Sequence, residues 1–250
     1  MRHPIILLIA LILSAFTLSC SHAEPAPKSH QPFDTLFLPV DTLPHEQVLP
    51  EGFVYLTDVI PDVLLDIRYF SDFNFVGTRI DGYERPVAIC TSQAAQALSR
   101  VADDLRAKGY LLKIFDAYRP QRAVDHFFRW ASDLDDQKMK QYFYPNMSKE
   151  NIFRHGYVAR KSAHTRGSTF DLTIFDMSLG RDVDMGGTFD FFGGISAPDC
   201  ASVTPQQHAN RMLLQKAMIA AGFSPCRGEW WHFKLNNEPF PNRSFNFPVR

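Results

Sequence analysis

The chain has 250 residues, of which 45% are hydrophobic and 21% are charged, and this composition is ordinary for a globular protein. A chain of this length is compatible with one large domain or two small ones, and it can bury a sizeable core without additional cross-links. The formal net charge of -1, without a marked basic run, gives no indication of nucleic acid or an anionic membrane surface as a partner.

The first residues, 1–23, predict an export signal. A short basic start is followed by an almost unbroken apolar run over residues 5–18. This run is short for a membrane span, which needs about 20 apolar residues, but it is typical of a secretory signal peptide. Cleavage after Ala23 would give a soluble periplasmic protein. Alternatively, the lipobox-like sequence that ends at Cys20 would give a lipoprotein, whose membrane contact is this lipid anchor.

Residues 24–50 are rich in Pro and His and lack periodicity, which indicates a flexible or extended arm ahead of a folded domain over 51–250.

The remaining cysteines are Cys90, Cys200 and Cys226, and none lies in a CxxC pair, so a thiolate zinc site is not expected. Because an exported protein can form disulfides, we expect a Cys200–Cys226 bridge that leaves Cys90 free.

The first predicted elements of the folded domain are a strand, a helix and a second strand. Residues 59–68 alternate apolar and acidic positions, which is typical of a strand. Residues 92–108 carry apolar side chains at helical spacing and are followed by Gly109, so they predict an amphipathic helix that ends there. Residues 110–115 are then expected to form a short buried strand.

Helices and strands continue to alternate irregularly along the rest of the chain. A proline suits the first helical turn and predicts a helix over residues 120–130. A strand is expected over 168–175, a helix over 209–221 that the following glycine closes, and a final strand over 229–235. Because no regular βαβ alternation is present, we expect an α+β domain with a mainly antiparallel sheet flanked by helices.

The segment that ends at Asp171 and the segment around His232 together suggest a metal centre. Hydrolysis of a peptide at neutral pH needs an activated water, and zinc held by three protein groups can bind such a water and lower its pKa to about 7. His164, Asp171 and His232 offer two imidazoles and one carboxylate, which zinc accepts. A turn at Gly167 would allow His164 and Asp171 to face one point.

Two further side chains could complete a hydrolytic site. Glu229 could take a proton from the water and pass it to the leaving amine. Residues three apart on a regular strand point to opposite faces, so a bulge or turn at Trp230 and Trp231 is required to bring Glu229 beside His232. Arg119 could stabilise the oxyanion of the tetrahedral intermediate.

Each of these residues also has an ordinary structural interpretation. A single histidine is usually packed or solvated, Asp171 could occupy a turn, and Glu229 could be a solvated surface charge. Arg119 could be a salt-bridge partner, and adjacent tryptophans usually belong to a core. The spacing of the residues alone therefore leaves the metal centre as one of several possibilities.

The segments SAHTRGSTFDLTIFD, EWWHF and DAYRPQRA together resemble the D-alanyl-D-alanine dipeptidases, a family of zinc peptidases. Four more blocks resemble the family in the same order: DIRYFSDFNFVG near Asp66, DGYERP near Asp81, DMGGTFD from Asp184, and NRMLL from Asn210. The resemblance runs from about Val54 to about Leu235, which is nearly all of the expected mature chain.

The resemblance implies an α+β fold shared with D,D-carboxypeptidases and the hedgehog signalling domain. It implies one zinc ion per subunit, with His164, Asp171 and His232 as the ligands. It further implies that Glu229 is the general base and acid and that Arg119 stabilises the transition state.

Substrate contacts are also implied by the resemblance. Ser162 would lie in the substrate pocket, and Asp190, together with Asp184, would hold the ammonium group of a dipeptide. The chain departs from the family pattern where its Gly-Thr step is shifted by one residue after Asp184, and where Ala163 replaces a larger residue. These departures concern the substrate preference and leave the metal ligands unchanged.

The implied activity is the hydrolysis of D-alanyl-D-alanine or a similar D,D-dipeptide to free D-amino acids, in peptidoglycan turnover in the periplasm. One alternative is a D,D- or L,D-carboxypeptidase that acts on muropeptide stems, which would need an open groove. Another is a non-catalytic, zinc-containing binding protein of the envelope, which would need a missing catalytic group. No nucleic-acid partner is expected, and the sequence does not define an oligomeric state.

Overall fold

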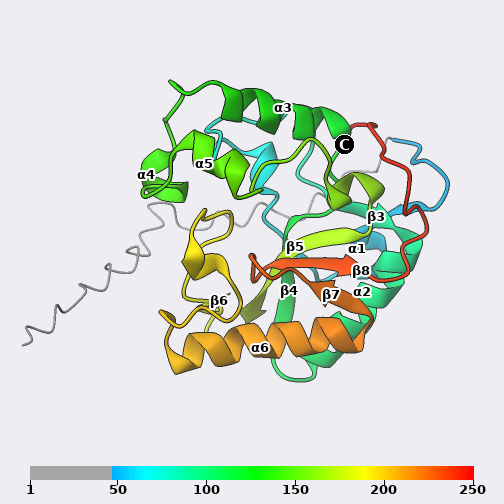
Figure 1. Ribbon diagram of the computed structural model, residues 1–250. Coiled ribbons are helices and arrows are strands. Elements are labelled where there is room, and N and C mark those ends of the chain that lie inside the picture. The colour runs from blue at the N-terminus through cyan, green and yellow to red at the C-terminus, as the bar shows by residue number, and fades with distance from the viewer. Residues whose placement is uncertain (1–46) are drawn as a thin grey trace, which may run out of the picture.

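The computed structural model describes residues 47–250 (Figure 1). The predicted signal peptide, Cys20 and most of the predicted arm lie outside these residues. No helix in the described part of the chain is long and apolar enough to cross a membrane. The elements in chain order are β1 (Phe53–Tyr55), α1 (Leu56–Val59), β2 (Leu64–Leu65), η1 (Arg68–Phe70), β3 (Ile89–Thr91), α2 (Ser92–Arg106), β4 (Tyr110–Asp116), α3 (Gln121–Ser132), α4 (Lys140–Phe143), α5 (Lys149–Arg154), η2 (Ala163–Arg166), β5 (Thr169–Asp176), β6 (Arg181–Asp182), η3 (Gly194–Ser196), α6 (Pro205–Ala220), β7 (Phe223–Pro225) and β8 (His232–Leu235).

The main sheet has the strand order β2-β4-β5-β8-β7, and β6 pairs with β5. The β2–β4 pair is parallel, and the other pairs of this sheet are antiparallel. Helix α2 packs on β4, α6 packs on β7, and the two helices contact each other. Helices α3, α4 and α5 gather at the opposite end of the view in Figure 1. The predicted α+β class, with a mainly antiparallel sheet, is confirmed.

The two long helices α2 and α6 show how local signals fix helix ends. The Thr91 side chain accepts a hydrogen bond from the amide of Ala94 at the start of α2, which is the usual arrangement of an N-cap. The predicted helix over 92–108 is thereby confirmed. Helix α6 begins four residues before the predicted start, because Thr204 and Gln207 form a reciprocal capping box.

Two predicted strands differ from the structure. The strand predicted over 59–68 is wrong for most of its length: only Leu64 and Leu65 pair with β4, while α1 and η1 occupy the flanking positions. Periodicity gave the wrong element there because buried side chains alternate in turns and short helices as well. The strand predicted over 229–235 starts only at His232, because the preceding residues form a turn.

The expected Cys200–Cys226 disulfide is not formed. Cys90, Cys200 and Cys226 are all free thiols, and Cys90 is buried. Cys200 lies in a turn after η3, whereas Cys226 follows β7 and its amide donates a hydrogen bond to the carbonyl oxygen of His232. The sheet and the η3 turn therefore fix the two cysteines separately.

A buried arginine on α6 fixes the irregular segment between β6 and α6. Arg211 is 1% exposed. Its guanidinium donates to three backbone carbonyl oxygens, those of Met185 at 2.7 Å, Ala197 at 2.7 Å and Ile195 at 2.9 Å. These charged hydrogen bonds hold a loop that has little regular structure of its own.

The last residues of the chain return to the first part of the domain. Val249 forms a parallel bridge with Tyr83, and its amide donates to the carbonyl oxygen of Gly82 at 2.8 Å. The Tyr55 hydroxyl donates to the carbonyl oxygen of Arg250 at 2.6 Å. The C-terminal segment is therefore part of the packed domain.

Candidate metal centre

Three neighbouring strands place polar side chains in one row across the sheet, which we call the strand row: Asp116, Asp171 and His232. Asp116 on β4 is the register partner of Asp171 on β5, and Asp171 is the register partner of His232 on β8. Residues directly opposite each other on adjacent strands have Cβ atoms about 4.5–5.5 Å apart. The register alone therefore brings a histidine and two carboxylates together.

His164 reaches the same point from the short helix η2. The side chain of Ser162 caps this helix by accepting from the His164 amide at 3.3 Å. Gly167 ends the helix with φ of 78°, and a Cβ at this position would overlap the ring of Phe53, so only glycine fits. The predicted turn at Gly167 is present.

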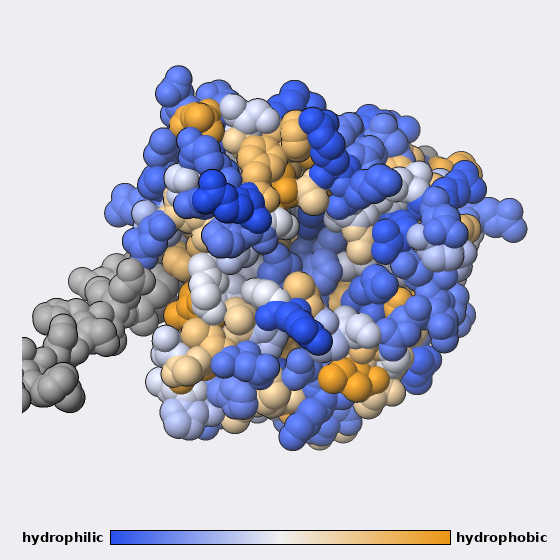
Figure 2. All heavy atoms as spheres, in the orientation of Figure 1, coloured by the Kyte–Doolittle hydropathy of each residue, from blue (hydrophilic) through white to orange (hydrophobic). Residues whose placement is uncertain are grey.

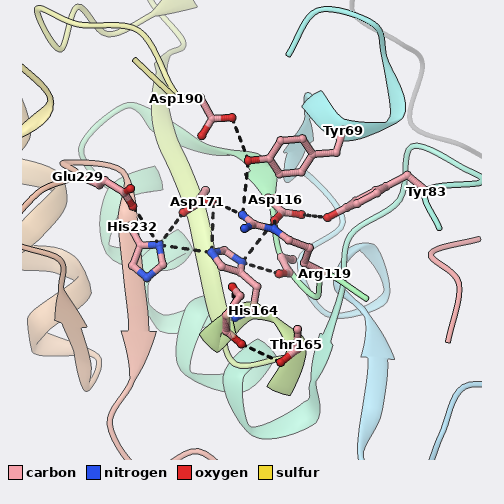
Figure 3. A network of polar contacts seen from close by, with 12 residues as sticks. Tyr69, Tyr83, Asp116, Arg119, His164, Thr165, Asp171, Asp190, Glu229 and His232 are labelled. Atoms are coloured by element: carbon pink, nitrogen blue, oxygen red, sulfur yellow. Dashed lines mark hydrogen bonds and ion pairs between the residues drawn. The ribbon is translucent and has the colours of Figure 1, made fainter. Parts of the chain in front are cut away.

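The three candidate ligands offer donor atoms that lie close together (Figure 3). His164 Nε2 is 3.3 Å from both His232 Nδ1 and Asp171 Oδ2, and His232 Nδ1 is 3.0 Å from Asp171 Oδ1. Ligands about 2.0–2.1 Å from one tetrahedral ion would lie about 3.3–3.4 Å apart, so the spacing fits zinc. His164 Nδ1 faces the carbonyl oxygen of Ala117 at 2.8 Å, which leaves Nε2 to bind the metal.

Glu229 lies beside these donors because the chain turns at the two tryptophans. The amide of His232 donates to the carbonyl oxygen of Glu229, and Glu229 Oε2 lies 3.5 Å from His232 Nδ1. This is the turn that the sequence required for a shared site. Burial raises the pKa of the Glu229 carboxyl group, and the nearby His232 opposes this shift.

Arg119 is held in a fixed orientation next to the candidate ligands. Its Nε donates to Asp116 Oδ2 at 2.8 Å, and its Nη2 donates to Asp171 Oδ2 at 3.2 Å. The guanidinium also lies over the rings of Tyr69 and Phe127. Asp116, to which we assigned no role from the sequence, thus positions Arg119.

Asp190 lies on another side of the same cluster, on the segment that Arg211 supports. The Tyr69 hydroxyl donates to Asp190 Oδ2 at 2.9 Å. Burial, reinforced by the charge of Asp171, raises the pKa of the Asp190 carboxyl group well above its usual value. Asp190 also has φ of 60°, an uncommon conformation for a residue other than glycine, as is often found at functional sites.

The structure does not bring Asp184 to this cluster. Its Oδ1 accepts from the amide of Gly186 at 2.8 Å, and its Oδ2 accepts from Gln207 Nε2 at 2.9 Å. Asp184 therefore ties its loop to the first turn of α6, at an exposed position away from the candidate ligands. Among the other residues implicated by the sequence, Ser162, Asp190, Glu229 and Arg119 lie around one cavity.

This cavity has a volume of about 270 Å³ and lies between the sheet, α3 and the segment that precedes η2. Figure 2 shows the molecular surface hollowed near the centre of this face, with hydrophilic residues at the bottom of the hollow. A second hollow, of about 290 Å³, lies between α2 and the end of β8. It contains none of the candidate ligands, so we assign the chemistry to the first cavity.

Apart from the exposed Lys161, the charges around the cavity do not balance without additional cations. Four buried or half-buried carboxyl groups surround a single guanidinium, that of Arg119. With neutral histidines and ionised carboxyl groups, three negative charges are in excess. A divalent metal ion would neutralise two of them, and an ammonium group of a ligand would neutralise the third. The four carboxyl groups belong to Asp116, Asp171, Asp190 and Glu229.

Two imidazoles and one carboxylate that converge in a cavity, with a further carboxylate and an arginine beside them, define a metal-dependent hydrolase site. The residues present fit a zinc ion in the donor types and in their spacing.

Comparison with known proteins agrees with this class. Residues 50–250 match the family model described as D-ala-D-ala dipeptidase (peptidase family M15), and the chain belongs to this family. The D-alanyl-D-alanine dipeptidase of Enterococcus faecalis is 40% identical over 80% of this chain and 100% of its own length. That of Enterococcus faecium is 37% identical over 80% of this chain and 98% of its own length.

A solved structure was also found, that of a mutant of the vancomycin resistance D,D-pentapeptidase VanY in complex with zinc. It has a TM-score of 0.36 and 15% identity, and it covers 62% of this chain and 77% of its own chain.

Proposed function

We propose that the protein is a zinc-dependent dipeptidase that hydrolyses D-alanyl-D-alanine, with one zinc ion held by His164, Asp171 and His232. The observation that carries this proposal is the convergence of these donor atoms beside Glu229 in a small cavity. The names of the related enzymes supply the substrate. Zinc supplies a Lewis acid that polarises the peptide carbonyl and lowers the pKa of water.

The remaining chemistry belongs to side chains of this chain. Glu229 accepts a proton from the attacking water and donates it to the nitrogen of the leaving D-alanine as the C–N bond breaks. The guanidinium of Arg119, fixed by Asp116, stabilises the negative charge that develops on the carbonyl oxygen. Because Asp116 holds Arg119 in place before the substrate binds, little reorganisation is needed in the transition state.

Another side of the cavity recognises the amino end of the dipeptide. Asp190 forms an ion pair with the free ammonium group, and the Tyr69 hydroxyl keeps the carboxylate in position. Ser162 lines the cavity next to the metal site. A longer peptide would lack the ammonium group at this point, so Asp190 favours dipeptides.

The size of the cavity also favours a dipeptide over a muropeptide stem. Pockets for drug-sized ligands have volumes of about 300–1,000 Å³, and this cavity of about 270 Å³ lies at the small end of that scale. A carboxypeptidase acting on stems would need an open groove. The presence of both Glu229 and Arg119 at the site argues against a purely binding role.

The predicted export signal supports a location in the periplasm, as a soluble protein or anchored through a lipid at Cys20. D-alanyl-D-alanine released from peptidoglycan would be available there. We therefore propose a role in peptidoglycan turnover.

The test is a hydrolysis assay with metal analysis. Purified protein should release free D-alanine from D-alanyl-D-alanine, lose this activity with a chelator and regain it with zinc. L-alanyl-L-alanine and a pentapeptide stem that ends in D-alanyl-D-alanine should be poor substrates. Hydrolysis of the stem at a rate similar to that of the dipeptide would overturn the assignment in favour of a carboxypeptidase.

A further inference from the structure

A dipeptide carries two opposite terminal charges, and the cavity described so far accounts for only one of them. Asp190 offers a negative charge to the ammonium group, but the carboxylate of the dipeptide needs a cation. Arg119 is already engaged by Asp116 and Asp171, and we have assigned it to the oxyanion of the transition state. A second cation beside the cavity would supply the missing partner for this carboxylate.

Lys161 is the remaining lysine or arginine that lines the cavity. Its side chain is exposed, and within the described residues it has neither a hydrogen bond nor an ion pair. It immediately precedes Ser162, the cap of η2, so the backbone of the metal-binding turn anchors its position. The neighbouring Arg160 does not line the cavity, because its guanidinium stacks on Phe128 at 3.7 Å from the ring centre.

Asp190 and the short helix η2, which follows Lys161 and Ser162 in the chain, lie on opposite sides of Asp171. In Figure 3, Asp190 and Tyr69 lie on one side of Asp171, and η2 with His164 and Thr165 lies on the other. An extended dipeptide spans about 7 Å, so it can cross the metal site with its ends on both sides. With its ammonium at Asp190, its carboxylate is directed toward the segment that precedes η2.

We propose that Lys161 binds the terminal carboxylate of the dipeptide and is a specificity-determining residue for substrates with a free C-terminus. This inference rests on the proposed dipeptidase function. The flexible stem and compact ammonium of lysine suit a small carboxylate that must enter and leave with each turnover. Because Lys161 and Asp190 bind the two terminal charges, together they select substrates of dipeptide length.

The test compares two substrates, D-alanyl-D-alanine and its C-terminal amide, which lacks the negative charge. For Lys161→Ala we expect KM for the free acid to rise about tenfold, as for the loss of one partly exposed charged hydrogen bond, while kcat stays unchanged. KM for the amide should not change. The preference of the wild-type protein for the acid over the amide should thus be lost, and Lys161→Arg should retain most of it.

Arg160→Ala is the matched control, because it removes the adjacent positive charge outside the cavity. It should leave both KM values close to those of the wild-type protein. Thermal unfolding and zinc content should be unchanged in Lys161→Ala, since the side chain is exposed and is not one of the candidate ligands.

Two outcomes would overturn the role of Lys161: an equal effect of Lys161→Ala on the acid and the amide, or an effect of Arg160→Ala on the acid as large as that of Lys161→Ala. A wild-type protein without activity on the dipeptide would instead overturn the proposed function itself. The two failures are therefore distinguishable in the same set of assays.

Discussion

Two parts of the cavity wall, the strand row and a set of loop residues, are held in place by different kinds of contact. The strand row consists of Asp116, Asp171 and His232, which are register partners on adjacent strands. A second part of the cavity wall, which we call the loop wall, consists of Asp190, residues 156–159, Lys161 and Ser162, which come from segments without long helices or strands. Backbone hydrogen bonds between strands hold the strand row in place. Side-chain contacts, such as the hydrogen bonds of Arg211, hold the loop wall in place.

This difference indicates that the sheet positions the groups that carry out the reaction, whereas the loops determine which substrate is recognised. A metal centre needs its ligands at fixed distances, and a sheet supplies such distances through hydrogen bonds that do not depend on the side chains. Recognition of a particular substrate can be adjusted in loops without disturbing the sheet. The strand row should therefore control turnover, and the loop wall should control binding and selectivity.

The largest expected effect concerns Glu229, which lies beside the strand row. Glu229→Gln keeps the size of the side chain but removes the proton acceptor, so kcat should fall about 100- to 10,000-fold. Zinc content, measured by atomic absorption, should stay at that of the wild-type protein, because the three ligands are intact.

Asp171→Asn is the contrasting variant, since it weakens a ligand itself and should reduce both activity and zinc content. If Glu229→Gln retained full activity, the assigned base would be wrong.

A large effect on stability is expected at Arg211, which supports the loop wall from α6. Arg211→Ala would leave three buried carbonyl oxygens without donors and should lower the free energy of unfolding by about 3 kcal/mol. For a domain of this size, this corresponds to a fall in Tm of roughly 6–12 °C. Arg211→Lys should recover part of the loss.

If the loop wall controls binding, the folded fraction of Arg211→Ala should show a raised KM with normal zinc content. Loss of zinc at a normal KM would contradict the separation between the two regions.

A smaller effect is expected at Asp190, within the loop wall. Asp190→Asn keeps an acceptor for the Tyr69 hydroxyl but removes the charge that faces the ammonium group. The value of kcat/KM for the dipeptide should fall about 10- to 100-fold, mainly through KM. An N-acetylated dipeptide, which has no ammonium group, should be affected little, and an equal loss on both substrates would exclude the assigned contact.

The smallest effect is expected at a salt bridge outside both regions, between Asp62 and Arg106 on α2. Arg106 lowers the pKa of the Asp62 carboxyl group below its usual value of 3.8. The stabilisation is therefore fully present above about pH 4 and is lost as the pH falls through the lowered pKa. Because this pair is partly exposed, Asp62→Asn should cost only about 0.5 kcal/mol at neutral pH.

Differential scanning calorimetry of Asp62→Asn and the wild-type protein should give Tm values about 1–2 °C apart at pH 7, with the difference disappearing at strongly acidic pH. Activity should be unchanged at pH 7. A large loss of activity would show that the region around α2 is coupled to the site.

The sequence predicted the strand row better than the loop wall. Asp171 and His232 lie in strongly patterned segments, and the glycine of η2 gave a clear signal that His164 could turn toward them. Asp116 was overlooked as a positioning residue because its role depends on the β4–β5 register, which the sequence does not specify. The resemblance to a family, more than periodicity, made the candidate ligands distinguishable from ordinary buried residues.

The loop wall was harder to predict because side-chain directions in irregular segments follow no period. The sequence around Tyr69 gives no indication of its bond to Asp190, and nothing in the sequence distinguishes Lys161 from an ordinary surface lysine. The family resemblance implies a substrate contact for Asp184 as well as Asp190, but a loop reversal at Gly186 directs Asp184 toward α6. The predicted helices were more accurate, because caps such as Thr91 act locally.

The hydrogen bonds from Val249 to Gly82 and from Tyr55 to Arg250 place the last residues of the domain next to its first strand. A short linker could join residue 250 to the start of β1, with new ends opened in an exposed loop, and such a circular permutant should fold because few contacts would be cut. By the same reasoning, an affinity tag fused directly after Arg250 would start beside the carbonyl oxygen that accepts from Tyr55, and a spacer of several glycines and serines would separate the two.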